Sequence, residues 1–238
     1  MLVLAFDSTA KAASVAVSDN DKLLGLYNID NGLTQSELLL PMAENLLKSL
    51  KIDFKDIGLL AASVGPGSFT GVRIGVSLVK GIAFGRDIPC SSVSTLEALA
   101  ENLAPLKGIL APCMDARRNQ VYNALFLSCE DGIKRLTPDR AISLVELAEE
   151  LKSYSDVPIY LCGDGYEIAH KTLTALEVKL ENTPELLITE NAYSIAKIAI
   201  RNYENGIFTD DLGIAPTYLR MPQAERERLE RLNNEEKK

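Results

Sequence analysis

The sequence predicts a two-lobed α/β protein in which each lobe has the element order β-β-β-α-β-α and a mixed sheet. Three observations predict this class: short apolar runs with tight turns open the chain, longer helical patterns follow them, and the same succession then recurs. A length of 238 residues suits two small domains. A chain of this size, 47% hydrophobic, buries roughly 70% of its unfolded surface.

The first lobe, expected over residues 1–103, opens with three strands joined by tight turns, which is typical of an antiparallel meander. A helix follows, in which apolar residues recur at helical spacing and form one wide stripe, and an apolar strand comes after it. A further helix near residues 94–103 closes the lobe. The earlier elements are expected at residues 2–6, 13–17, 23–27, 36–50 and 59–64.

A turn rich in glycine and proline, residues 64–75, joins the last of these strands to a second long helix. Gly65 and Gly67 permit close backbone approach, and Ser68 or Thr70 can cap the helix. The N–H groups at such a helix start suit a phosphate or a carboxylate. The turn is not a Walker A loop, because no Gly-Lys-Ser/Thr follows it. The alternative is a tight β–α turn without a ligand.

The second lobe, expected over residues 104–215, repeats the pattern after a boundary segment at residues 104–108. Its first strands lead to a helix capped by Ser143 and to a strand that ends at Gly163-Asp164-Gly165. The next helix is poor and is interrupted by a polar segment, and Gly206 ends the last helix. The strands are expected at residues 109–114, 120–127, 133–136 and 159–162, and the helices at 143–152 and 192–205.

The composition bears on three questions: whether the chain binds nucleic acid alone, whether it crosses a membrane, and whether its cysteines are reduced. The net charge is −8 and no basic stripe with interleaved aromatic residues occurs, so strong binding of nucleic acid by the chain alone is not expected. A tail over residues 216–238 alternates basic and acidic residues, which is more typical of a solvated helix than of an RNA-binding arm. No apolar run reaches the ~18 residues of a membrane span, and no basic leader region opens the sequence. Cys90, Cys113, Cys129 and Cys162 are scattered, which indicates reduced thiols in a cytoplasmic protein.

The order β-β-β-α-β-α, with Asp7 ending the first strand, resembles a lobe of the actin-like ATPase superfamily, which has a ribonuclease H-like core. In that superfamily Asp-Gly-Thr hairpins surround the phosphates and carboxylates hold Mg²⁺. The segment Asp7-Ser8-Thr9 lacks the hairpin glycine, so Asp7 either faces a nucleotide or caps a turn. By this resemblance the candidate nucleotide- or phosphate-facing residues are Asp7, Ser8, Thr9, Gly65, Gly67 and Ser68.

A narrower resemblance rests on motifs that follow one another along nearly the whole chain. They are Leu4-Ala5-Phe6-Asp7-Ser8-Thr9, the helix start Leu38-Leu39-Leu40-Pro41, Gly-Pro-Gly-Ser-Phe-Thr-Gly-Val-Arg-Ile-Gly at residues 65–75, Met114-Asp115-Ala116-Arg117-Arg118 with Val121-Tyr122, and Pro216-Thr217-Tyr218-Leu219-Arg220. As an ordered set they resemble the bacterial TsaB (YeaZ) family. The resemblance is weakest between about residues 130 and 190.

The resemblance implies a subunit of the machinery that makes N6-threonylcarbamoyladenosine (t6A) beside the anticodon of tRNAs reading codons that begin with A. In that family TsaB forms a heterodimer with its paralogue TsaD, which carries the transfer chemistry, while the ATPase TsaE and the enzyme TsaC complete the pathway. The expected partners are therefore TsaD and TsaE, with tRNA reached through the complex and a homodimer when the chain is alone. No tightly bound cofactor is expected for the chain alone, and ATP or ADP is expected only in the complex.

The helix after the glycine turn is apolar nearly all round and carries glycines that recur along its length. Each interior glycine costs up to ~1 kcal/mol against alanine, which suggests a packing reason. The helix is either buried within its own lobe or pairs with a like-folded partner in a four-helix bundle, as the resemblance implies. The interface residues under the second hypothesis are Leu39, Met42, Leu46, Gly71, Val72, Gly75, Leu78, Val79, Gly81 and Ile82. Gly75→Leu or Gly81→Leu would then block pairing and leave the monomer folded.

TsaD proteins carry a metal-binding His-x-x-x-His after their glycine turn, and Thr95 and Leu99 occupy the two histidine positions here. The single histidine, His170, has no partner histidine and is expected to be a surface or half-buried polar residue. No catalytic residue and no metal site are therefore expected, and a peptidase is disfavoured. Arg117 and Arg118 either meet a carboxylate of a partner or face water.

Together these features imply a non-catalytic activating subunit, a pseudo-enzyme that TsaD requires in order to transfer threonylcarbamoyl to tRNA. The alternative is an active actin-like ATPase or kinase, which the fold class alone permits.

Overall fold

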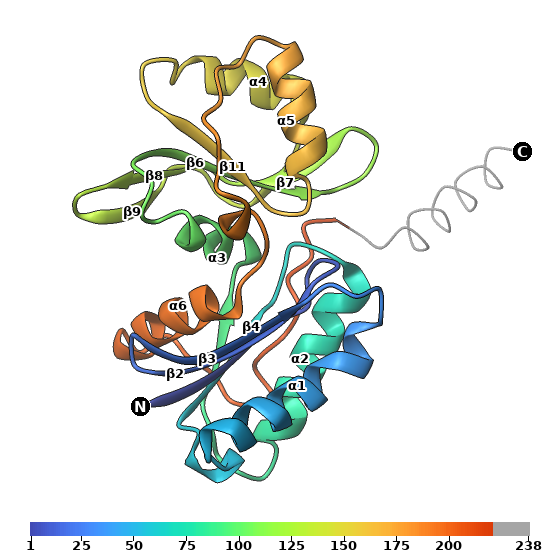
Figure 1. Cartoon of the computed structure of the whole chain (residues 1–238), viewed down its shortest axis with the longest axis vertical. Coiled ribbons are helices and arrows are strands. Elements are labelled where there is room, and N and C mark those ends of the chain that lie inside the picture. Colours follow the sequence, from blue (N-terminus) through green and yellow to red (C-terminus); the bar gives the residue numbers. More distant parts are fainter. Residues whose placement is uncertain (221–238) are drawn as a thin grey trace, which may run out of the picture.

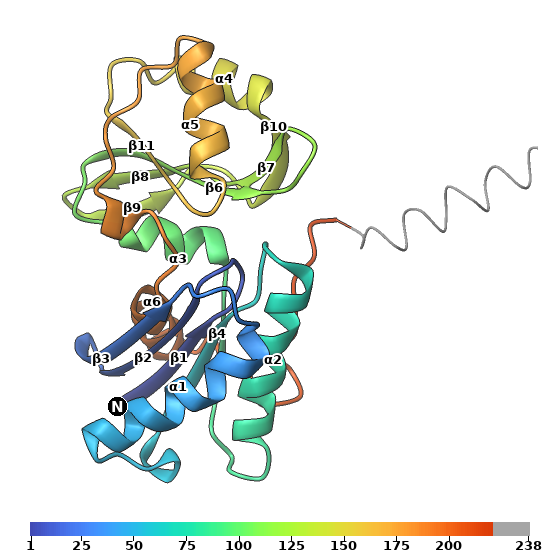
Figure 2. The same ribbon diagram turned by 45° about the vertical axis from the view of Figure 1, so that its right-hand side comes forward.

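The computed structural model describes residues 1–220, which form two α/β lobes, each built on its own sheet (Figure 1). Turning the molecule shows one helix, α3 (Thr95–Asn102), in the layer between the two sheets (Figure 2). Among residues 1–220, no helix is long and apolar enough to cross a membrane. The part of the charged tail that begins at residue 221 lies outside the described residues.

The first sheet has the order β3-β2-β1-β4-β5. Its strands are β1 (Leu2–Asp7), β2 (Ala13–Asp19), β3 (Lys22–Ile29), β4 (Leu59–Ser63) and β5 (Cys90–Val93). The antiparallel meander β1–β3 and the parallel strand β4 confirm the predicted order. Strand β5 was not expected, because its centre is Ser91-Ser92; the Ser91 side chain is fully buried in the structure.

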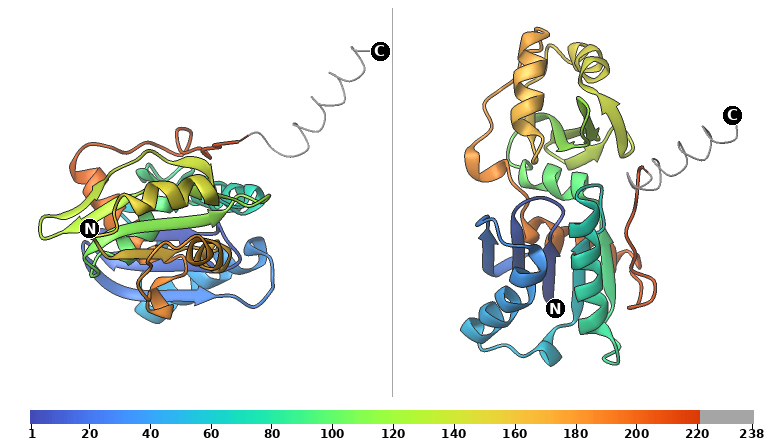
Figure 3. Two further views of the ribbon diagram at one scale, coloured as in Figure 1. Left: turned by 90° about the horizontal axis from the view of Figure 1, so that it is seen from above. Right: turned by 90° about the vertical axis from the view of Figure 1, so that its right-hand side faces the viewer.

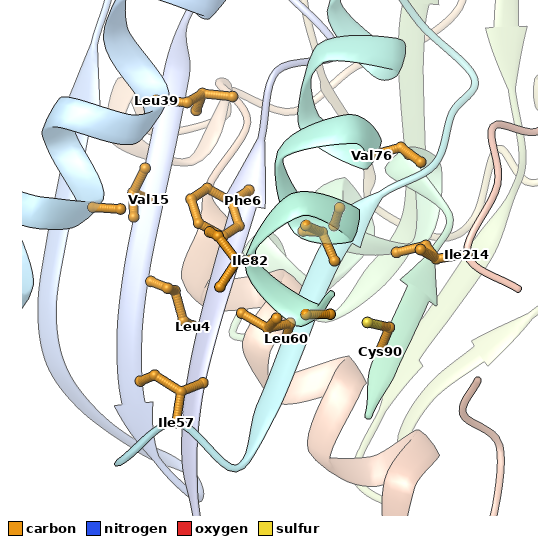
Figure 4. Close-up of a cluster of buried hydrophobic side chains, with 14 of the residues drawn as sticks. Leu4, Phe6, Val15, Leu39, Ile57, Leu60, Val76, Ile82, Cys90 and Ile214 are labelled. Carbon is orange, nitrogen blue, oxygen red and sulfur yellow. The ribbon is translucent and has the colours of Figure 1, made fainter. Parts of the chain in front are cut away.

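Two helices cover one face of this sheet: α1 (Gln35–Leu50) contacts β2 and β3, and α2 (Phe69–Ala83) contacts β4 and β1. The Glu37 carboxylate accepts a hydrogen bond from the Thr34 backbone N–H at 3.0 Å, which stabilises the start of α1. Between sheet and helices lies an apolar core (Figure 4). It brings strand residues such as Phe6 and Leu60 against Val76 and Ile82 of α2. A short 3₁₀ turn, η1 (Phe54–Asp56), precedes β4.

The second sheet resembles the first but is built from more and mostly shorter strands. Its strands are β6 (Gly108–Asp115), β7 (Gln120–Asn123), β8 (Phe126–Cys129), β9 (Gly132–Arg135), β10 (Arg140–Ser143) and β11 (Ile159–Cys162). The single strand expected over residues 120–127 is divided into β7 and β8, which pair with β6 in one register. At the division the Leu125 N–H donates to the Thr137 hydroxyl rather than to a strand. Strand β11 runs parallel to β6, as β4 does to β1, so the predicted duplication is confirmed.

The outer face of the second sheet is covered by α4 (Leu144–Lys152) and α5 (Tyr166–Ala175). Ser143 caps α4, as predicted, by accepting from the Glu146 N–H at 3.1 Å. After α5 the chain runs through an irregular segment with one 3₁₀ turn, η2 (Glu185–Leu187), to α6 (Ala192–Glu204). Views from above and from the side show both lobes with helices on each face of the sheet (Figure 3).

Helices α3 and α6 are exchanged between the lobes, which differs from the expected boundary at residue 103. Helix α3, expected in the first lobe, packs Leu96 and Leu99, together with Leu103 just after it, against β6 and β8 of the second sheet. Helix α6, expected in the second lobe, covers the back of the first sheet. The two helices also touch, and Lys197 pairs with Glu101 at 2.7 Å. Periodicity predicts that a helix has an apolar face but not which sheet that face covers.

Residues 207–220 form a strap that returns along the edge of the first lobe. Cys90 and Thr209 form a backbone bridge beside β5, and the Thr217 N–H donates to the Val64 carbonyl oxygen at 2.7 Å. The strap therefore brings the end of the described chain to the glycine turn, between the two lobes.

Candidate functional site

A cleft of about 680 Å³ lies between the lobes, lined by loops from both. The first lobe contributes the loop after β1 and the glycine turn after β4, and the second contributes the loops after β6 and β11. Ligands of open α/β sheets bind outside the carboxyl ends of the strands, which is where these four loops lie. Lining residues that carry charge are Lys11, Asp30, Asp115, Arg117, Asp164, Glu190 and Arg220.

Asp7 caps the turn that follows β1. Its side chain is 1% exposed, and one carboxylate oxygen accepts from the Thr9 N–H at 2.8 Å and from the Thr9 hydroxyl at 2.7 Å. The other oxygen accepts from the Ser63 hydroxyl at 2.7 Å. Burial raises the pKa of Asp7, and these hydrogen bonds oppose the rise. Of the two hypotheses for Asp7, the structure shows the turn cap.

The loop of residues 7–9 packs onto the glycine turn. The Ser68 N–H donates to the Thr9 carbonyl oxygen at 2.7 Å, and the Ser8 hydroxyl donates to the Gly71 carbonyl oxygen at 2.8 Å. Ser68 caps α2 by accepting from the Gly71 N–H at 3.2 Å. The Ser68 amide at this helix start is therefore bound by the chain itself rather than directed at a ligand.

Four of the six predicted phosphate-facing residues are buried and do not line the cleft, which corrects that expectation. Asp7, Ser8 and Thr9 are at most 1% exposed, because their side chains make hydrogen bonds within the turn, to β4 and to α2. Gly65 lies beneath the strap, where an added Cβ would come 2.6 Å from the Thr217 carbonyl oxygen. Of the predicted set, the cleft lining includes Gly67 and Ser68.

The predicted partner interface also needs correction, because eight of its ten residues are buried inside the first lobe. They pack against their own sheet or the loop after β1, and they are Leu39, Met42, Leu46, Gly71, Val72, Gly75, Val79 and Ile82. Of these eight, Leu39 also lines the groove between α1 and α2. The glycines on α2 show why. A Cβ at Gly71 would lie 1.9 Å from the Ser8 carbonyl oxygen, and one at Gly75 would lie 2.5 Å from the Ser8 hydroxyl oxygen. These glycines let α2 approach the loop after β1 and are not directed at a partner.

An open groove lies instead between α1 and α2, on the side that faces away from the sheet. It measures about 500 Å³ and is mostly apolar. Its lining residues are Gln35, Ser36, Leu39, Leu40, Phe69, Thr70, Arg73, Ile74, Ser77 and Leu78. Leu78, predicted for the interface, is half-buried here, and Gly81 is exposed one turn further along α2. Leu40 was missed by the sequence analysis; its side chain is 40% exposed.

Arg117 and Arg118 lie in the turn between β6 and β7. Both are exposed, and together with Asn119 they have left-handed backbone angles, which side chains rarely adopt. Arg117 lines the cleft and pairs with Asp115 of the same turn at 3.3 Å. Whether either arginine meets a partner stays a prediction.

The strap closes one side of the cleft and joins the lobes. Tyr218 stacks on Phe69 of α2, with ring centroids 4.8 Å apart, and its hydroxyl accepts from Arg73 Nε at 2.7 Å. Two residues on, Arg220 donates to the Ala116 carbonyl oxygen at 3.3 Å and to the Gln120 side chain. The motif at residues 216–220 was noted in the sequence, but its role as a bridge between the lobes could not be inferred from local pattern.

The two residues at the histidine positions of the TsaD motif, Thr95 and Leu99, are buried in the interior of this protein. Thr95 and Leu99 are at most 1% exposed, and Leu99 packs against the second sheet. His170 is half-buried and stacks on Tyr166 with ring centroids 5.4 Å apart, as expected of a polar residue on a helix. Among residues 1–220, no three His, Cys, Asp or Glu side chains lie close enough together to hold a metal ion. All four cysteines are free thiols, and burial raises the pKa of Cys113 to about 12.

Glu190 is a feature of the cleft that the sequence analysis missed. The side chain is 3% exposed, and its Oε1 has no hydrogen-bond partner among residues 1–220. Burial, together with the nearby carboxylates of Asp7 and Asp164, raises the pKa of Glu190 from 4.5 to about 8. Its sequence context is a polar segment before a helix, which carries no signal of burial.

Glu190 is expected to make the protein less stable as the pH rises. In the unfolded chain this carboxyl loses its proton near its ordinary pKa of 4.5, whereas in the folded chain it keeps the proton until about pH 8. The free energy of unfolding should therefore fall between about pH 5 and pH 8, by about 4 kcal/mol at most. Urea titrations across this range should show that fall in the wild type and a much smaller one in Glu190→Gln. Equal slopes in the two proteins would contradict this assignment, and exposed Asp30→Asn serves as the control.

The two lobes and the duplicated sheet define an α/β protein with the actin-like fold. The structure resembles component A of (R)-2-hydroxyglutaryl-CoA dehydratase from Acidaminococcus fermentans, with a TM-score of 0.50, 9% identity, and 86% of this chain and 99% of that chain covered. It is more similar to YeaZ from Pseudomonas aeruginosa, with a TM-score of 0.73, 21% identity, and 92% and 99% of the two chains covered.

Sequence comparison narrows the class. Residues 34–226 match the family model described as TsaD: tRNA N6-adenosine threonylcarbamoyltransferase. The tRNA threonylcarbamoyladenosine biosynthesis protein TsaB of Bacillus subtilis is 31% identical, covering 94% of this chain and 96% of that protein. TsaB of Escherichia coli is 35% identical over 63% of this chain and 65% of that protein. The chain belongs to the TsaB family of tRNA threonylcarbamoyladenosine biosynthesis proteins.

Proposed function

We propose that this chain is a non-catalytic activating subunit of t6A synthesis that docks on a TsaD-type enzyme. The observation that carries the proposal is the apolar groove between α1 and α2. Leu40 lines it at 40% exposure, and Ile74 and Leu78 are only half-buried there. An apolar groove between two helices is completed by a helix of a partner, with side chains interdigitating as in a protein interior.

A like-folded partner suits this groove. TsaB and TsaD families share the domain whose model matches most of this chain, so a TsaD-type enzyme can present an equivalent helix pair. Two such pairs make a four-helix bundle, with Leu40 and Leu78 in its centre and polar residues such as Gln35, Ser36 and Ser77 at its rim. When the chain is alone, the same face pairs two copies.

The transfer chemistry belongs to the partner in this proposal. The carboxylate of Asp7 is occupied by Thr9 and Ser63, and Thr95 and Leu99 stand where TsaD carries its histidines. A net charge of −8 leaves the grip on tRNA to other subunits. TsaE joins the same complex, ATP or ADP is bound only in the assembly, and the cytoplasm is where tRNA and these subunits meet.

Two measurements test the pairing and separate it from the alternative of an active ATPase or kinase. Size-exclusion chromatography with light scattering is expected to show a one-to-one complex of this chain with a TsaD-type enzyme. Mg-ATP is expected neither to raise the melting temperature of the isolated chain nor to be hydrolysed by it. Failure to form the complex, or stoichiometric Mg-ATP binding with turnover by the chain alone, would favour the ATPase.

A further inference from the structure

The interlobe cleft is lined by a buried acid, Glu190, of which one carboxyl oxygen has no partner in the described chain. Burial raises the pKa of this carboxyl, and the backbone N–H groups of Glu190 and Asp164 oppose the rise. Glu190 lines the cleft at 3% exposure, and its Oε1 has no hydrogen-bond partner among residues 1–220. The backbone beside it is anchored to both lobes: the Thr189 carbonyl oxygen accepts from Asn102 at 2.7 Å, and the Glu190 carbonyl oxygen accepts from Asn28 at 2.9 Å. A buried acceptor held in place without a partner lowers stability unless a bound group supplies a donor.

The titratable groups that act most strongly on Glu190 are two carboxyls. Asp7 at the end of β1 and Asp164 after β11 are near enough to raise the pKa of Glu190, and Asp164 accepts from the Asp115 N–H at 2.9 Å. Burial raises the pKa of Asp164, and Arg117 and Lys11 oppose that rise. Within residues 1–220, no cation forms an ion pair with Glu190 or with Asp7. The other charged groups that face the cleft are Lys11, Arg117 and Arg220, and Asp30 and Asp115.

The chemistry around Glu190 favours a cation with several N–H donors. A polyphosphate would find no cation at Glu190, Asp7 or Asp164, and it would be repelled by any of the three carboxyls that is ionised. A bare metal ion needs several ligands at short range, and residues 1–220 bring no three suitable side chains together. An ammonium or guanidinium group is larger and can donate to acceptors that lie further apart. A cleft of about 680 Å³ accommodates a small molecule that carries such a group.

We propose that the interlobe cleft binds a small organic ligand through an ammonium or guanidinium group that donates a hydrogen bond to Oε1 of Glu190. The carboxyl is ionised in the bound state, because a cation beside it stabilises the charged form. At about pH 7 the free protein holds most of this carboxyl protonated, so binding releases a proton to solvent. Glu190 does not line the α1–α2 groove, although Gln35 and Phe69 line both hollows, and binding in the cleft does not depend on the proposed partner.

The test uses the full chain and agmatine, a small probe that carries both a guanidinium and an ammonium group. Isothermal titration in an amine-free buffer measures affinity, and a pH indicator in weakly buffered solution measures proton release. We expect saturable binding with release of nearly one proton per ligand at about pH 7. Tetramethylammonium, which has charge but no N–H donor, should bind at least about tenfold more weakly.

Matched variants locate the site. Glu190→Gln keeps the size of the side chain and should weaken agmatine binding at least about tenfold and abolish proton release. Asp164→Asn, which can still accept from the Asp115 N–H, should weaken binding less than Glu190→Gln does. Glu44→Gln, on the exposed face of α1 and outside the cleft lining, is the matched control for removal of a carboxylate and should change neither quantity. Circular dichroism checks that each variant folds. No saturable agmatine binding, equal binding by Glu190→Gln, equal binding of tetramethylammonium, or competition by equimolar Mg²⁺ would each overturn the proposal.

Discussion

Gly71→Ala is expected to lower the free energy of unfolding by about 3 kcal/mol. An added Cβ would lie 1.9 Å from the Ser8 carbonyl oxygen, and that atom is backbone in a buried turn. The turn is fixed by the hydrogen bonds of Asp7 and by the bond from Ser8 to α2, so it cannot move aside without breaking them. Urea denaturation of the isolated chain measures the loss.

Gly81→Ala on the same helix is the matched control. No atom lies within 4 Å of the position that a Cβ would take, and the residue is exposed. Alanine in a helix interior is up to ~1 kcal/mol more favourable than glycine, so this variant should be as stable as the wild type or slightly more stable. Equal destabilisation by the two substitutions would show that the approach of α2 to the loop after β1 does not explain the glycines. Gly75→Leu is accordingly expected to unfold the first lobe rather than only to block pairing.

Leu40→Arg is expected to weaken binding to a TsaD-type enzyme about 30-fold or more and to leave the fold intact. Leu40 lines the groove but is 40% exposed, so arginine can be accommodated in the monomer. In the complex the same side chain would place a charge in the apolar centre of the interface, which costs about 2 kcal/mol or more. Isothermal titration with the partner measures the affinity, and the melting temperature of the isolated variant reports on the fold.

Val145→Arg provides the control for this charge. Val145 lies on α4 in the second lobe and is 60% exposed, away from the groove. The substitution introduces the same arginine at another exposed apolar position, so the variant should bind the TsaD-type enzyme as tightly as the wild type does. If Leu40→Arg bound the partner as tightly as Val145→Arg, the assignment of the groove as the docking face would be wrong.

The sequence predicted the framework of both lobes well because that framework rests on local patterns. Tight turns between short apolar runs identified β1 to β3, and a serine before a helical pattern identified the start of α4. Long-range choices were not predictable in this way. Helices were expected at the positions of α3 and α6, but no local pattern states that each covers the sheet of the other lobe.

Because local patterns do not reveal long-range packing, the partner interface was misplaced and Glu190 was missed in the sequence analysis. An apolar pattern all round a helix such as α2 indicates burial on more than one side, but it does not say which side covers its own sheet. The interface was therefore placed on residues such as Val79, which is fully buried, and missed Leu40. Glu190 was missed for the converse reason, because a charged residue in a polar segment gives no sign that tertiary structure buries it.

The rate of t6A formation on tRNA, reconstituted from TsaC-, TsaD- and TsaE-type proteins with ATP, tests the central claim most directly. The account predicts background formation without this chain, formation that rises and saturates at one chain per TsaD-type subunit, and no restoration by Leu40→Arg. Full activity in the absence of the chain, or t6A formation by the chain without a TsaD-type enzyme, would contradict it.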